Sequence, residues 1–264
     1  MRAVIQFVLA VLVVAACLNG APDINTTAVS LPHNSNITSI LPAPGAVVGV
    51  AHPVVVTFKA PVTDRPAAEL ALGIRSTPAM TGKYEWLENN VVQWKPDRFW
   101  PAHSTVKLSV EGQSAAFTTG PAVVGVASIS EHTFTVTVDG QSPADFPAPH
   151  HLPHAGEPGV LLASMGRPEY ETPVGTYSVL SKERSVTMDS SSVGIPVDNP
   201  DGYLLEVDYA VRITRRGLFV HSAPWAVTAM GFENTSHGCI SLNPAEAEWY
   251  FNNVHVGDPV IVQE

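Results

Sequence analysis

The chain has 264 residues, of which 45% are hydrophobic and 14% are charged, and its formal net charge is −10. This composition suits two modest domains or one large β domain with a buried core. The negative charge and the absence of Lys/Arg clusters argue against a surface for nucleic acid or anionic lipid. The 23 prolines and 19 glycines are spread along the chain, as is typical of a turn-rich β protein.

Residues 1–20 are predicted to be a signal peptide or a lipoprotein leader. Arg2 precedes an apolar stretch, Ala3 to Ala16, that is short for a membrane span. Val14 to Cys17 is similar to a bacterial lipobox, in which Cys17 would be lipidated and would anchor the protein. Ordinary cleavage nearby and an uncleaved anchor are the alternatives. Each route predicts an exported protein of the periplasm or cell wall, anchored to the membrane or free.

Residues 21–38 are polar and lack apolar periodicity, which predicts a flexible spacer. From 39 to 119, short alternating segments predict an immunoglobulin-like (Ig-like) β-sandwich. These segments are 54–58, 82–86, 91–94, 105–110 and 115–118. The region has no cysteine pair, and its tryptophans (Trp86, Trp94 and Trp100) are interpreted as packing residues rather than a carbohydrate platform.

Gly120-Pro121 marks the predicted start of a second domain, 120–264. A strand at 133–138 is followed by a Pro/His-rich segment, 143–158, containing His150, His151 and His154. A metal site there is less favoured than a solvated loop, because no cysteine or closely spaced carboxylates accompany the imidazoles. Further on, Asn243-Pro244 predicts the start of a helix that runs to about residue 252, and 259–262 predicts a final strand.

The chemistry of this second domain centres on Cys239. The only other cysteine, Cys17, lies in the leader, so the mature protein holds a lone thiol in an oxidising compartment. A thiolate is a good nucleophile, and an imidazole within reach can take its proton and later return it to a leaving amine. His237 and His221 are the two candidates for that base. His221 follows the predicted strand 217–220 and is preferred.

The neighbours of these residues also suit acyl transfer. Ser222 can orient the His221 ring through its hydroxyl or its backbone carbonyl. Gly238 lacks a Cβ, so the backbone N–H groups of Gly238 and Cys239 are predicted to form an oxyanion hole. A buried structural cysteine is the alternative interpretation, and the His, Ser and Gly residues around the thiol weigh against it.

Two segments, His221-Ser222-Ala223-Pro224-Trp225 and Ser236-His237-Gly238-Cys239, closely resemble the active site of the L,D-transpeptidases of the YkuD family. The segment 172–175 resembles a further motif of that family, and the resemblance covers about 120–264. It implies a mainly β catalytic sandwich with a short helix after the nucleophile. The Ig-like domain ahead of it, and Asn234-Thr235 ahead of the second motif, are similar to mycobacterial-type members.

The resemblance also implies an activity. The donor is a peptidoglycan tetrapeptide stem that loses D-Ala and forms a thioester with the cysteine, and the acceptor is a diaminopimelate amine of another stem. The product is a 3→3 cross-link, carbapenems are expected inhibitors, and neither a cofactor nor a metal is implied. An L,D-carboxypeptidase and a non-catalytic wall-binding protein are the alternatives.

Residue by residue, the resemblance assigns Cys239 as nucleophile, His221 as base and Ser222 as its orienting residue. Ser236, His237 and Gly238 match the surround of the thiol. The resemblance further implies substrate contacts from a lid, a donor-contacting strand, the pocket wall and the motif flanks, namely Met188, Tyr203, Arg216, Gly217, Trp225, Asn234 and Ser241. Ser241 departs from the Asn or Arg usual in the family, and 143–158 is longer than usual there.

Overall fold

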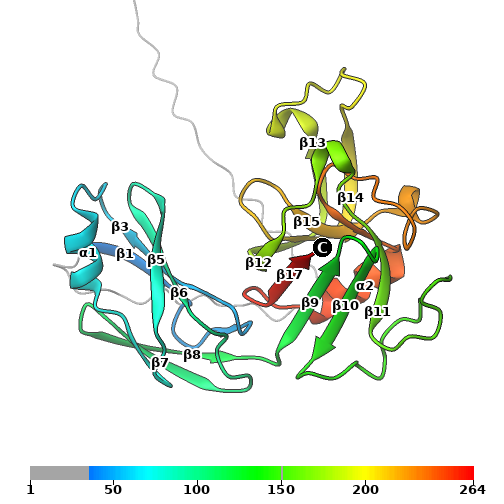
Figure 1. The fold of residues 1–264 in the computed structure, drawn as a ribbon. Coiled ribbons are helices and arrows are strands. Elements are labelled where there is room, and N and C mark those ends of the chain that lie inside the picture. The colour runs from blue at the N-terminus through cyan, green and yellow to red at the C-terminus, as the bar shows by residue number, and fades with distance from the viewer. Residues whose placement is uncertain (1–35, 150) are drawn as a thin grey trace, which may run out of the picture.

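The computed structural model describes residues 36–149 and 151–264. The predicted leader with Cys17, most of the predicted spacer, and His150 lie outside these described residues. Two domains lie side by side, with the N-terminal one in blue to cyan and the C-terminal one in green to red (Figure 1). Within the described ranges, neither helix is long and apolar enough to cross a membrane.

The N-terminal domain is a sandwich of two four-stranded sheets. One sheet has the order β1 (Ile37–Leu41), β3 (Val54–Phe58), β6 (Val91–Pro96) and β5 (Gly82–Glu88). The other has the order β2 (Val47–Val48), β8 (Gln113–Thr119), β7 (Thr105–Val110) and β4 (Arg75–Thr77). Alternating residues of both sheets meet in one apolar core, which contains the buried Trp94 and Trp100. The predicted segments therefore form strands, and β1 begins two residues before the predicted domain start.

A short helix, α1 (Arg65–Leu72), was not predicted in this domain. Asp64 caps its N-terminus by accepting a hydrogen bond from the backbone N–H of Ala67. Gly73 ends it in the left-handed region at φ 49°. Local capping residues thus define a helix too short to show a clear apolar period.

The C-terminal domain is built on one nine-stranded sheet with the order β12-β17-β9-β10-β11-β16-β15-β14-β13. The bounds are β9 (Val123–Ser128), β10 (Thr133–Val138), β11 (Val160–Ser164), β12 (Gly175–Ser178), β13 (Ser181–Asp189), β14 (Leu204–Arg212), β15 (Phe219–Ser222), β16 (Ile240–Leu242) and β17 (Pro259–Gln263). One apolar core draws residues from both halves of this sheet. The long β13–β14 hairpin projects from the body of the domain (Figure 1).

Helix α2 (Pro244–Asn253) directly follows β16 and begins where the sequence predicted a helix start. The Asn243 side chain caps it by accepting from the N–H of Ala245 at 3.1 Å, and Pro244 occupies the first turn. Tyr250 of this helix is fully buried and packs edge-on against Phe134 of β10. Three single-turn 3₁₀ segments complete the domain: η1 (Pro168–Tyr170), η2 (Ser190–Val193) and η3 (Pro224–Ala226).

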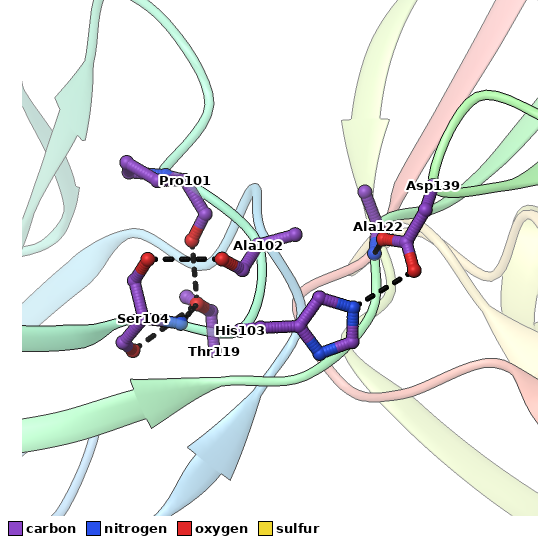
Figure 2. Close-up of polar contacts among 7 residues, drawn as sticks. All are labelled: Pro101, Ala102, His103, Ser104, Thr119, Ala122 and Asp139. Atoms are coloured by element: carbon purple, nitrogen blue, oxygen red, sulfur yellow. Dashed lines mark hydrogen bonds and ion pairs between the residues drawn. The ribbon is translucent and has the colours of Figure 1, made fainter.

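The two domains meet along a closely packed junction. His103 and Asp139 form an ion pair across it at 2.8 Å, and Asp139 also accepts from the Ala122 N–H (Figure 2). Gly49 lies so close to the second domain that a Cβ there would fall 2.0 Å from the backbone nitrogen of Asp258. This approach explains a glycine at that position, because any side chain would push the domains apart.

Candidate active site

The predicted nucleophile and base are brought together by a parallel strand pair that is not local in sequence. β15 and β16 pair with His221 opposite Ser241 and Val220 opposite Ile240. Val220 and Ile240 point into the apolar core, and side chains alternate along a strand. His221, Ser241 and Cys239, which directly precedes β16, therefore share the opposite face, where all three line one cavity of about 470 Å³.

His221 is held in one tautomer. Its Nδ1 lies 2.8 Å from the backbone carbonyl oxygen of Ser222, which can only accept, so Nδ1 carries the proton and Nε2 has the free lone pair. The sequence predicted that Ser222 orients this ring through its hydroxyl or its carbonyl, and the contact in the structure is made by the carbonyl. Burial lowers the pKa of His221 to about 4, so the ring is neutral at pH 7.

The Cys239 thiol is also neutral at pH 7. Burial raises its pKa to about 11. The thiol donates a weak hydrogen bond to the carbonyl oxygen of Gly217, at 3.7 Å. Gly217 sits in a turn at φ 96°, a conformation that favours glycine. Of the predicted pair Arg216-Gly217, only the glycine meets the thiol, and the Arg216 side chain is exposed and outside the cavity lining.

The turn before the thiol is closed by one hydroxyl. Ser236 Oγ accepts from the N–H of Gly238 at 3.0 Å and donates to the carbonyl of Cys239 at 2.7 Å. Gly238 has φ 115°, so a side chain there would be strained. The Gly238 N–H is therefore occupied by Ser236, which corrects the prediction that it is free to serve in an oxyanion hole. Of the two predicted donors, the Cys239 N–H remains the candidate.

Thr172 is a site residue to which sequence reasoning assigned no role. Its buried hydroxyl accepts from the N–H of Gly166 at 2.9 Å and donates to the carbonyl of Gly238 at 2.7 Å. It thereby ties the 165–172 segment to the turn that carries the thiol. The motif-like segment beginning at Thr172 was the available signal, but only the fold shows which backbone atoms its hydroxyl reaches.

His237, the other candidate for the base, has its ring engaged with two tyrosine rings. Its ring lies between Tyr170 and Tyr203, with centroid separations of 4.8 and 4.9 Å. Burial lowers the pKa of His237. Its Nε2 is buried and has no hydrogen-bond partner among the described residues. The ring thus links Tyr170, in η1, to Tyr203, in the loop of the β13–β14 hairpin.

Most of the other residues predicted to contact substrate line this cavity. Met188 and Tyr203 line it from the β13–β14 hairpin, and Trp225 lines it from η3 with 55% of its surface exposed. Six further lining residues were not predicted, because they carry no chemical signature in sequence: Leu205, Val207, Ala226, Thr228, Ala229 and Thr235. The result is a partly apolar groove around a thiol and an imidazole.

Asn234, like Arg216 and Gly217, is a predicted contact that the structure places outside the cavity lining. Its amide oxygen accepts from the N–H of Met165, and its amide nitrogen donates to the carbonyl of Ile129. It lies outside the cavity lining and fixes the backbone behind the motif. No group of three or more His, Cys, Asp or Glu residues with the arrangement of a metal site occurs in 36–149 or 151–264.

Comparison with known proteins places the chain in a family. Residues 22–115 match the bacterial Ig domain family, and 122–262 match the L,D-transpeptidase (YkuD) catalytic domain family. The chain is 65% identical, over 271 residues and the full length of both, to a Mycobacterium tuberculosis protein named "Probable L,D-transpeptidase 3". It is 46% identical to L,D-transpeptidase 1 of the same species, over 99% of each chain.

Solved structures agree. A crystal structure of M. tuberculosis L,D-transpeptidase 3 with a faropenem-derived adduct is 71% identical with a TM-score of 0.82, covering 86% of this chain and 98% of that one. A structure of LdtMt1 in complex with imipenem is 49% identical with a TM-score of 0.77, covering 86% of this chain and 99% of that one. These matches confirm the mainly β, two-domain fold. The chain belongs to the L,D-transpeptidase family, with an Ig-like domain ahead of its catalytic domain.

Proposed function

We propose that this protein is a peptidoglycan L,D-transpeptidase that acts through a thioester on Cys239. The observation that carries the proposal is the placement of Cys239, directly before β16, and of a tautomer-fixed His221 on the adjacent parallel strand β15, where both line one groove. The names of its full-length relatives support the same activity. The donor is a tetrapeptide stem that ends in D-Ala, and the acceptor is a diaminopimelate amine.

In the acylation step, Nε2 of His221 removes the thiol proton as Sγ attacks the carbonyl carbon before the terminal D-Ala. The oxyanion that forms is stabilised by the backbone N–H of Cys239, a kind of donor worth roughly 3 kcal/mol. Collapse breaks the C–N bond, and the imidazolium gives its proton to the departing D-Ala amine. A thioester remains on Cys239.

In the second step, the acceptor amine attacks the thioester carbonyl and gives a proton to His221. The C–S bond breaks, the thiolate regains that proton, and a 3→3 cross-link is released. Water in place of the amine would give carboxypeptidase products. The cavity contributes apolar walls from Met188, Trp225 and the β14 side chains, which reduce the access of water to the thioester.

The test combines mass spectrometry of the protein and of its products. Incubation with a carbapenem should add one drug mass to the intact protein, and the Cys239→Ala variant should stay unmodified while remaining folded. A disaccharide tetrapeptide with an amine acceptor should give the cross-linked dimer. Hydrolysis alone, in the presence of excess acceptor, would identify a carboxypeptidase. Full cross-linking activity in Cys239→Ala would refute the mechanism.

We further propose that the enzyme is exported and works at the cell wall, where its substrate lies. The apolar segment that follows Arg2 supports export, and Cys17 is the proposed lipidation site. Fractionation should find the wild type with membranes, and Cys17→Ser should release it to the soluble exported fraction. Equal partitioning of the two would exclude anchoring through Cys17.

A further inference from the structure

The Pro/His-rich segment 143–158 is, in its described residues, the largely solvated loop that its composition predicts, but a few of its side chains contact the rest of the domain. Near its start, Phe146 packs edge-on against Trp249 of helix α2, with ring centroids 4.7 Å apart. Near its end, His154 pairs with Glu157 at 2.9 Å, within the segment itself. The first of these contacts attaches the segment to the catalytic domain.

Between these two points the segment reaches three consecutive residues, Met230 to Phe232. His151 lies with Nε2 2.8 Å from the carbonyl oxygen of Met230, which must accept, so His151 donates. The His151 ring is stacked on Phe232, with centroids 5.2 Å apart and planes 8° from parallel. Pro153 lies over Gly231, where an added Cβ would be 3.3 Å from the proline ring.

These three residues end the stretch that forms one wall of the catalytic groove. Ala226, Thr228 and Ala229 line the groove together with Cys239. Met230 is fully buried behind them, and its N–H is bonded to the carbonyl of Ala226 at 3.2 Å. A shift of Met230 would therefore move the lining residues directly.

We propose that His151 is a positioning residue for this wall and, through it, for the donor stem. The inference rests on the function proposed above. The ring holds Met230 by its hydrogen bond and Phe232 by its stacked face. His151 does not belong to the lining of the groove, so it acts on where the donor lies rather than on proton transfer. A displaced wall weakens contacts that the bound donor and the transition state share, and loss of such uniform binding raises KM with little change in kcat.

The experiment compares four variants in the full chain with two reagents. One reagent is the disaccharide tetrapeptide donor, which needs the wall. The other is iodoacetamide, which needs only an accessible Cys239. For His151→Ala we expect the donor KM to rise about five- to tenfold while kcat stays within about twofold, because the catalytic pair is untouched. The alkylation rate of Cys239 should not change.

The matched control is His154→Ala, which removes an imidazole of the same segment that pairs with Glu157 and should leave both rates as in the wild type. His151→Gln retains a donor and should recover part of the KM. His151→Phe keeps the stacked ring without the donor and should show the KM rise with little loss of stability. It therefore tests the hydrogen bond even if the alanine variant folds poorly.

Unchanged donor kinetics in both His151→Ala and His151→Phe would overturn the proposal. So would a parallel increase in Cys239 alkylation, since that pattern indicates general loosening of the fold. A wild-type protein that is not acylated by the donor at all would refute the proposed function instead, and the two failures are thus distinguishable.

Discussion

The pH dependence of Cys239 alkylation tests the electrostatics of the site directly. Burial raises the pKa of the thiol from 9.0 to about 11, and lowers the pKa of His221 to about 4. The resting pair is therefore thiol and neutral imidazole, not thiolate and imidazolium. The thiolate fraction at pH 7 falls about a hundredfold below that of an ordinary cysteine, equivalent to about 3 kcal/mol.

The assay follows iodoacetamide labelling from pH 5 to 10 in a Cys17→Ser background, where Cys239 is the one remaining thiol. The rate should climb about tenfold for each pH unit across this range, with no plateau. The same protein unfolded in urea supplies the reference and should level off near pH 9. A folded-state plateau below pH 8 would refute the reasoning, because it would reveal a thiolate already stabilised by an imidazolium.

Three further outcomes are expected. Ser222→Ala should retain transpeptidase activity within about twofold, because the His221 ring is held by a carbonyl that alanine also carries; a tenfold loss would implicate the hydroxyl. Acid should destabilise the fold as pH falls from 6.5 to about 4, since the unfolded chain binds a proton that buried His221 excludes. Urea unfolding should show a decrease of about 3 kcal/mol in the free energy of unfolding over this pH range, and this contribution should be absent in His221→Gln. Gly49→Ala should cost about 1–3 kcal/mol in thermal unfolding by its clash with Asp258, whereas Gly120→Ala, whose added Cβ would make ordinary van der Waals contacts at 3.8–3.9 Å, should be near neutral.

Much of the fold could be predicted because each strand carries its own local signal. Alternation in 105–110 and 133–138 identified β7 and β10, and the Asn243-Pro244 start identified α2. Helix α1 was missed since its one buried residue, Leu72, gives no period to detect. Its cap residues, Asp64 and Gly73, were the available signal.

In the candidate site, the sequence predicted the residues whose side chains are chemically reactive. It did not predict the hydrogen bonds that hold the backbone around them. Cys239 and His221 stand out by residue type, and the groove does contain both. The Gly238 N–H is occupied by its near neighbour Ser236, in a turn that residue type alone does not specify. The amide of Asn234 bonds to Met165 and Ile129, which lie far away in the sequence. No local pattern shows such contacts, because they form only when the sheet closes.

The parallel pairing of β15 with β16 has a consequence for how the enzyme becomes active. A parallel pair requires a crossover, and here the crossover, 223–239, includes the groove wall and ends at the nucleophile. Base and nucleophile therefore meet only after the chain between them has docked. Before that moment the thiol is an ordinary cysteine, reactive toward any electrophile yet unable to process a stem. Loss of labelling at Cys239 during refolding should thus coincide with the gain of acylation by a β-lactam. The reactivity of this one residue therefore shows when the site has folded.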